Sequence, residues 1–229
     1  MELSPYYEKK IECFNCKKSF SSLKVRSKTI KVEHTESDFQ PIYAENTVNG
    51  YFYNVFVCEH CGFAFTEDFT KYFAPGVQQE IQDKITKNWV NHSLGGERSL
   101  SEAIQAYKLA LLSGVTKKEK FVTTAGLALR LAWLNRSVNN EVQERRFLKI
   151  ARDYYMNSYS NEDYSSTQMS EMRILYMIGE LSRRIEDFGN ATRYFSKVIE
   201  KQNVGGEAKL IEMAKEQWNK LREQREINQ

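Results

Sequence analysis

The chain has 229 residues and a formal charge of +3, with 41% apolar and 28% charged residues. That length allows one large domain or two with separate cores, and three prolines and eleven glycines leave little room for a disordered linker. The sequence has no run of 18 apolar residues, so we expect no membrane-spanning helix. The first ten residues also lack the apolar centre of a secretory signal. We therefore expect a cytoplasmic protein without membrane contact. The weak net charge does not by itself indicate a nucleic-acid partner.

The N-terminal part of the chain holds all four cysteines, in two pairs of identical spacing, Cys13-x₂-Cys16 and Cys58-x₂-Cys61. Each pair places two sulfurs on one side of a tight turn, and two such turns complete the tetrahedral thiolate site that Zn²⁺ prefers. Because cysteine fills all four positions, we expect one structural zinc with no open position for water. The alternative is unmetallated cysteines or a redox pair, but a redox protein needs only one such pair, at a helix N-terminus.

Two runs rich in β-branched and aromatic residues surround these turns, at 23–33 and 51–57. Residues 34–50 between them resemble a polar loop. Gly62 follows the second cysteine pair, at the position of such a turn that often needs a positive φ, and Lys17 takes the same place after the first pair. These features predict a small zinc ribbon with a long insertion between its two turns.

From about residue 76 helical periodicity replaces the β signals, so we expect a zinc ribbon over 1–70 and a helical domain over 71–229. Apolar residues recur at helical spacing through seven segments. The expected helices run from Val77 to Trp89, from Ser99 or Ser101 to about Gly114, and over about 118–136, 140–159, 168–186, 190–201 and 206–227.

The fifth and sixth expected helices have the residue spacing of a tetratricopeptide hairpin. Gly179 and Ala191 would let the two helices approach closely, and Phe195 would fill the space above them. Because the 34-residue period is not kept elsewhere, we expect degenerate, tetratricopeptide-like stacking of helix hairpins. An irregular helical bundle is the alternative.

With both halves considered together, the whole chain resembles the uncharacterised bacterial domain-of-unknown-function family 2225. The resemblance implies an N-terminal zinc ribbon and a tetratricopeptide-like C-terminal region, and it brings no known activity. Relatives often carry a cysteine where this chain has Gln40. The residues that carry the resemblance are Cys13-x₂-Cys16, Phe20, Leu23-Lys-Val-Arg26, Asp38-Phe39, Pro41, Tyr43 and Tyr53-x-Val-x-Val-Cys58-x₂-Cys61-Gly62-Phe63-Ala64.

Four residues of the fifth expected helix would face a concave groove if the tetratricopeptide register holds. These residues are Arg173, Tyr176, Glu180 and Arg183. Two arginines beside a tyrosine suit a peptide carboxylate or an acidic segment, whereas the alternative is a solvated helix face. Our leading interpretation is therefore a non-catalytic zinc-binding interaction or scaffold module with a protein or peptide partner.

A second interpretation is nucleic-acid binding by the ribbon. Lys24, Arg26 and Lys28 would share one face of the predicted strand, with Phe14 and Phe20 available for base stacking. A basic strand is, however, also a common protection of a sheet edge.

An enzyme of unrecognised type is the third interpretation. The sequence has no Walker A, GxGxxG, GxSxG or HExxH motif. Zinc would also occupy every cysteine and leave none as a nucleophile. We therefore expect a protein without catalytic activity.

Overall fold

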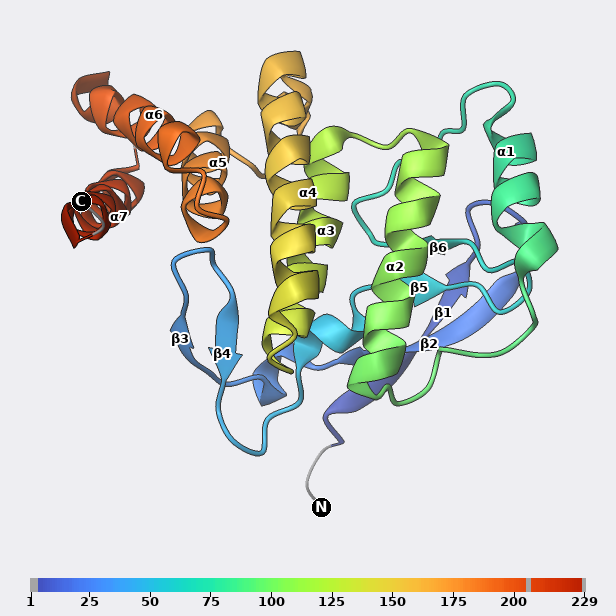
Figure 1. Ribbon diagram of the computed structural model, residues 1–229. Helices are drawn as coiled ribbons and strands as arrows, with labels where there is room; N and C mark the ends of the chain where they lie inside the picture. The colour runs from blue at the N-terminus through green and yellow to red at the C-terminus, as the bar shows by residue number, and fades with distance from the viewer. Residues whose placement is uncertain (1–3, 205–206, 228–229) are drawn as a thin grey trace. The chain divides into compact units, whose positions relative to one another are not determined.

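The computed structural model describes residues 4–204 and 207–227 (Figure 1). These residues form two compact units. The first consists of Met1–Thr35 and Pro41–Glu119, and the second of Glu36–Gln40 and Lys120–Gln229. This division falls elsewhere than the boundary at 70/71 expected from the sequence.

The strands of the first unit form three separate antiparallel hairpins (Figure 1). Their bounds are β1 Tyr6–Glu12 with β2 Ser19–Val25, β3 Val32–Thr35 with β4 Pro41–Tyr43, and β5 Phe56–Val57 with β6 Ala64–Phe65. The first and third hairpins each carry one cysteine pair in the turn between their strands. Each predicted cysteine turn is thus held at the end of a strand ladder.

The strand boundaries differ from those expected. The predicted strand 23–33 is interrupted by a 3₁₀ turn, η1 Ser27–Thr29, and the first half of 51–57 belongs to η2, Gly50–Tyr53. The Asn49 side chain accepts the Tyr51 N–H at 3.0 Å and caps this second turn. Strand β1 was not predicted, because most of its residues are polar and only Ile11 is buried.

Two helices complete the first unit: α1 Val77–Lys84, followed by η3 Thr86–Asn88, and α2 Leu100–Lys117. Ser99 and Glu102 form a capping box at the start of α2, as its sequence indicates. Two side chains of α2 form hydrogen bonds with β6 and η2. Ser113 Oγ accepts the Ala64 N–H at 3.1 Å, and the Tyr107 hydroxyl donates to the Tyr51 carbonyl at 3.0 Å. These contacts place α2 with the strands and not with the later helices.

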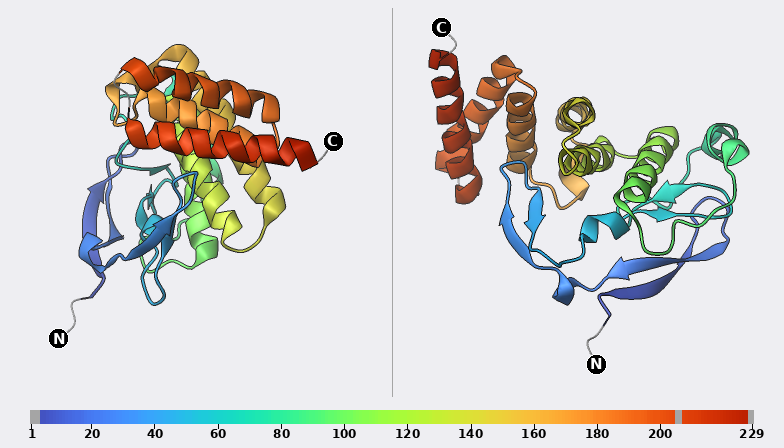
Figure 2. Two further views of the ribbon diagram at one scale, coloured as in Figure 1. Left: turned by 90° about the vertical axis from the view of Figure 1, so that its left-hand side faces the viewer. Right: turned by 60° about the horizontal axis from the view of Figure 1, so that its bottom comes forward.

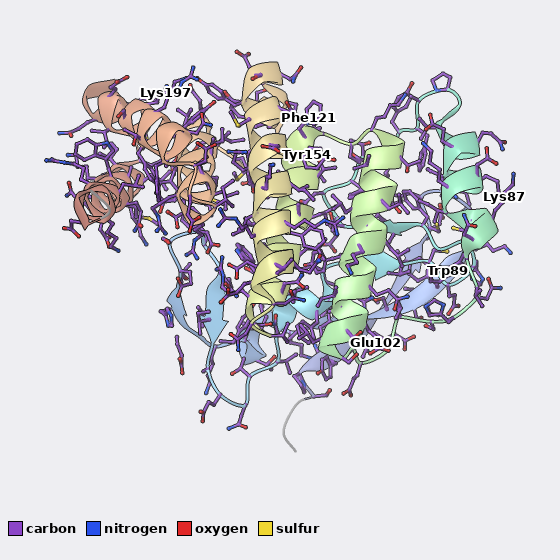
Figure 3. The ribbon with its side chains drawn as sticks, in the orientation of Figure 1. Lys87, Trp89, Glu102, Phe121, Tyr154 and Lys197 are labelled. Atoms are coloured by element: carbon purple, nitrogen blue, oxygen red, sulfur yellow. The ribbon has the colours of Figure 1, made fainter. Side chains whose placement is uncertain are left out.

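The second unit consists of five helices, each beside the next along the chain (Figure 2). They are α3 Phe121–Arg136, α4 Glu141–Asn161, α5 Glu171–Arg184, α6 Phe188–Glu200 and α7 Ala208–Ile227, with short 3₁₀ turns η4 Asp163–Ser166 and η5 Lys201–Val204. Phe121 of α3 stacks on Tyr154 of α4 with ring centroids 6.2 Å apart (Figure 3). A β-carbon on Gly179 of α5 would lie 2.8 Å from the Phe195 ring of α6, which is the close approach expected at this pair.

The fold class is therefore confirmed: small antiparallel strands with a four-cysteine cluster precede seven helices in the described part of the chain. The tetratricopeptide-like character of the helices stays a prediction. None of the described helices is long and apolar enough to span a membrane.

Candidate metal centre and helical cradle

The four cysteine sulfurs converge on one point. All four lie within 4.8 Å of one another, with Cys13 Sγ 3.7 Å from Cys61 Sγ and Cys16 Sγ 3.6 Å from Cys58 Sγ. Four ligands about 2.3 Å from a tetrahedral Zn²⁺ would be separated by about 3.8 Å, so these separations fit a bound ion and are far too long for a disulfide. The cluster can hold a metal ion, as the cysteine spacing predicted.

The two cysteine turns, which we term the first knuckle (residues 13–18) and the second knuckle (residues 58–63), have the same backbone pattern. The Lys17 N–H donates to the Cys13 carbonyl at 3.0 Å, and the Gly62 N–H donates to the Cys58 carbonyl at 2.8 Å. In both knuckles the N–H of the first cysteine donates to the carbonyl five residues later at 3.0 Å. Lys17 and Gly62 have φ values of 62° and 71°, the left-handed conformation that the sequence indicated for Gly62.

The surroundings of the cluster exclude water from most of it. Cys13 and Cys58 are fully buried, Cys61 is 4% exposed, and Cys16 is half-buried. The Asn15 side-chain N–H donates to Cys61 Sγ at 3.8 Å, and the Thr86 hydroxyl donates to the Cys61 carbonyl at 3.2 Å. A metal here would be enclosed by groups that orient its ligands.

The thiols differ in acidity because they lie so close together. The pKa of Cys61 is lowered to about 2, mainly because the Cys13 and Cys58 thiols donate hydrogen bonds to its sulfur. The Phe63 backbone N–H and Asn15 lower this pKa further, against the opposing effect of burial. The pKa of Cys13 is raised, first by its hydrogen bonds to Cys58 and Cys61 and then by burial. The ionisation of each of these thiols therefore depends on the protonation of its neighbours.

The residues of the nucleic-acid interpretation do not form the surface expected of them. Lys24 pairs with Glu67 at 3.0 Å, and the Arg26 guanidinium donates to the Ser4 carbonyl at 3.2 Å. Strand β2 ends at Val25, so Arg26 and Lys28 lie beyond the strand whose alternation was to align them with Lys24.

The two phenylalanines of that interpretation also lie within contacts. Phe20 is only 6% exposed, and Phe14 stacks on Phe65 with centroids 4.3 Å apart. The expectation of two rings available for bases was therefore wrong for Phe20, because its ring is buried edge-on against Phe65 with centroids 6.4 Å apart.

The four residues predicted to line a groove on α5 come together around segment 36–40, the five residues that the chain contributes to the second unit from between β3 and β4. Tyr176 and Glu180 are fully buried: the Tyr176 hydroxyl donates to the Ser37 carbonyl at 2.8 Å, and Glu180 accepts the Ser37 hydroxyl at 2.6 Å. Arg183 pairs with Glu180 at 2.7 Å. The Arg173 guanidinium lies 4.3 Å from the centre of the Phe39 ring. These side chains thus face an acidic segment of their own chain.

Three further residues were not singled out from the sequence. Arg136 pairs with Asp38 at 2.7 Å, the Trp133 indole N–H donates to Asp38 at 3.1 Å, and Arg184 Nε lies 3.6 Å from the same carboxylate. Gln40 donates to the Trp133 carbonyl at 3.5 Å and accepts a hydrogen bond from Arg136. The one sequence signal was Asp38-Phe39 in the family resemblance. We name this set of contacting residues the cradle: Trp133, Arg136, Arg173, Tyr176, Glu180, Arg183 and Arg184.

A family model described as "Uncharacterized protein conserved in bacteria (DUF2225)" matches residues 6–221. The chain belongs to this family. The match includes both knuckles, segment 36–40 and the whole cradle, so the DUF2225 family spans the two units. No curated protein and no solved structure matches the chain.

Proposed function

We propose that this chain is a non-catalytic, zinc-binding module for protein–protein interaction or scaffolding. The observation that carries the metal half is the convergence of four cysteine sulfurs at separations of 3.6 Å and 3.7 Å across the two knuckles. A tetrahedral set of four thiolates favours Zn²⁺ and leaves no position at which the ion could activate water. Reducing conditions in the cytoplasm, where we place the protein, keep such thiols available as ligands.

The proposed zinc has a structural role. It would join the turn of the β1–β2 hairpin, whose strands bury few of their residues, to the turn of the β5–β6 hairpin, a ladder of only two residue pairs. Structural zinc binding in small peptides contributes on the order of 10–16 kcal/mol to folding. Because two-stranded hairpins are marginally stable alone, this contribution supports the first unit as a rigid surface.

The interaction half rests on the helical unit. Stacked helices present extended surfaces to partners, and the cradle residues already bind a five-residue acidic segment, which is the recognition chemistry proposed for them. The sequence contains only four cysteines, and the zinc site would use all of them, so no thiol remains for nucleophilic catalysis.

The metal half is tested by elemental analysis of the purified chain. We expect one zinc per chain, no thiol reactive to Ellman's reagent before denaturation, and four reactive thiols after the metal is released. Cys58→Ser should lower the zinc content to below half, whereas His60→Ala, inside the same knuckle but bonded to the Ser19 carbonyl, should leave it at one. A folded chain with four reactive thiols and no zinc, or one that holds iron, would contradict the proposal.

The interaction half is tested by affinity purification of the tagged chain from its bacterial host, followed by mass spectrometry and reconstitution with the purified partner. We expect a defined complex that withstands gel filtration. Multiple turnover of any substrate by the zinc-loaded chain, lost on substitution of a residue outside the metal site, would replace this proposal by an enzymatic one.

A further inference from the structure

Segment 36–40 is held in the second unit by its acidic side chain. Asp38 is fully buried, and its carboxylate receives Arg136 at 2.7 Å, the Trp133 indole N–H at 3.1 Å, and Arg184 at 3.6 Å. Two arginines and an indole donor on one carboxylate form a site specific for a negative charge. A neutral side chain of the same shape would remove the one carboxylate that both guanidinium groups share and leave Arg136 with Glu144 and Arg184 with Glu180.

The residues on either side of Asp38 make different contacts with the cradle. The Phe39 ring lies 5.5 Å from the Tyr176 ring and under the Arg173 guanidinium, an arrangement that favours an aromatic side chain. At Ser37 the cradle contacts both hydroxyl and backbone carbonyl, through Glu180 and Tyr176. The cradle therefore distinguishes charge, aromatic character and main-chain position within three consecutive residues, as peptide-binding sites do.

The strands that flank the segment contribute little burial. All four residues of β3 are exposed, the three residues of β4 are half-buried, and the register between the strands shifts between Val32 and His34. Phe39 has a φ of 65°, a conformation that costs a non-glycine residue free energy. Within residues 32–43, burial is concentrated at Asp38 and Gln40, which contact the cradle. Residues 32–43 thus have the character of a tethered ligand.

We propose that the cradle is a recognition site for a short acidic segment with an aromatic residue after the acid, and that segment 36–40 occupies it as a ligand from the same chain. The occupant that the cradle accepts in exchange is a segment of a partner protein with the same Asp-aromatic chemistry. Such an exchange replaces each buried ion pair by an equivalent one, so no buried charge is left without a partner. This inference rests on the proposed interaction function and names the chemistry of the partner.

Because segment 36–40 is part of the same chain, it competes with any free peptide for the cradle. A tethered ligand competes at an effective concentration on the order of millimolar. A free peptide should therefore bind the intact chain weakly and bind more tightly once the tethered segment has lost its own contacts.

The test uses the zinc-loaded full chain and a fluorescein-labelled peptide with the sequence of residues 33–43, followed by fluorescence anisotropy. We expect the Asp38→Ala/Phe39→Ala chain to bind the peptide at least tenfold more tightly than the wild-type chain. A peptide with alanine in place of its Asp and Phe should not bind. Adding Arg136→Ala to the double variant should abolish binding, whereas adding Arg146→Ala, an exposed arginine of α4 outside the cradle, should not.

Each remaining outcome decides the proposal. If the double variant keeps its helical circular dichroism and does not bind the peptide, the proposal is wrong. If the double variant does not fold, Phe39→Ala alone takes its place, because it keeps the buried ion pairs. Failure of this variant to fold as well would make the segment an integral part of the second unit and overturn the proposal.

Two further measurements separate the alternatives. A wild-type dimer that disappears in the double variant would identify a second copy of the chain as the occupant and overturn the partner assignment. Zinc content is measured on every sample, because it tests the proposed function separately from peptide binding. A chain that binds the peptide but holds no zinc would contradict the metal half of the proposed function and leave this inference standing.

Discussion

The indole ring of Trp89 lies against Gly62, so closely that a β-carbon on this glycine would come within 2.7 Å of the ring (Figure 3 labels Trp89). The ring is fixed there because its Nε1–H donates to the Glu59 carbonyl at 2.7 Å. Gly62 also has a φ of 71°. Residue 62 therefore needs glycine for two independent reasons, its conformation and the space taken by Trp89.

We predict that Gly62→Ala destabilises the zinc-loaded chain by about 1–3 kcal/mol, through strain in the second knuckle and displacement of Trp89. Urea denaturation measures the loss. The matched control is Lys17→Gly at the equivalent position of the first knuckle, where φ is 62°. Glycine relieves that conformation, so this variant should be as stable as the wild type or up to about 1 kcal/mol more stable. Equal stability of Gly62→Ala and wild type would contradict the packing described for Trp89.

A second prediction concerns the hydrogen bond from Asn15 to Cys61 Sγ, at 3.8 Å. Partners that orient metal ligands commonly change metal affinity by about 10–100-fold, so we expect Asn15→Ala to weaken zinc binding about tenfold. Competition with a chromophoric chelator measures the affinity. His60→Ala is the control and should stay within about twofold, because this side chain bonds the Ser19 carbonyl away from the sulfurs. A similar loss in both variants would indicate a general weakening of the ribbon.

A third prediction follows from the ionisation of Asp38. Burial raises the pKa of this carboxyl, but the hydrogen bond from Arg136 and the charges of Arg136 and Arg184 outweigh burial and hold the pKa below its ordinary value of 3.8. A lowered folded-state pKa means that the contribution to stability is fully present above the unfolded pKa. It is lost as the pH falls below about 3.8 and through the folded pKa.

Asp38→Asn should therefore lower the free energy of unfolding by about 1–3 kcal/mol at neutral pH, because it removes the buried charge that Arg136 and Arg184 share, while Arg136 keeps Glu144 and Arg184 keeps Glu180 and Glu36. The difference between wild type and variant should shrink as the pH falls below the unfolded pKa, and taking the difference cancels the acid release of metal that both share. Asp153→Asn, at a carboxylate 51% exposed on α4, should cost less than about 1 kcal/mol at any pH. A constant difference for Asp38→Asn between pH 7 and 3 would contradict the ionised pair.

A fourth prediction tests the contact of α5 with α6. Alanine in place of a mid-helix glycine normally stabilises by about 1 kcal/mol. At Gly179 the new β-carbon would lie 2.8 Å from the Phe195 ring, so we expect Gly179→Ala to cost about 1–3 kcal/mol instead. Thermal or urea unfolding measures it. Gly126→Ala on α3 is the control, because only the far end of the long Arg130 side chain lies near its β-carbon, and it should be neutral or stabilising. Phe195→Leu should recover part of the Gly179→Ala loss.

The cysteine cluster could be predicted from sequence because each knuckle is a local structure. Four consecutive residues fix the positions of the two sulfurs in one pair. Gly62 indicated the positive φ that follows the second pair. Strand boundaries were less accurate, since β1 is mostly polar and the Pro41–Tyr43 strand lies within a polar stretch. The 3₁₀ turn at Gly50–Tyr53 depends on an Asn49 side-chain cap inside a run whose composition indicates a strand.

Only part of the cradle could be predicted from the sequence. Four of its residues on α5 followed from the tetratricopeptide-like spacing, but Arg184 and the contact with segment 36–40 did not. Asp38 and Trp133 are 95 residues apart in the chain, and no periodic pattern relates them. The position of Arg136 near the end of α3 likewise has no local signature, because an arginine in the last turn of a helix is common without any partner.

The assignment of segment 36–40 has a consequence for dividing this chain into fragments. Its five residues belong to the second unit, while the residues on both sides of it belong to the first. No single break in the backbone can therefore yield the two units intact. A fragment ending at Glu119 would retain Asp38 with no arginine of the cradle beside it, and the complementary fragment would carry Arg136 and Arg184 without their carboxylate. Two-piece expression of this protein thus requires that the pieces be mixed, or that the five residues be supplied as a peptide.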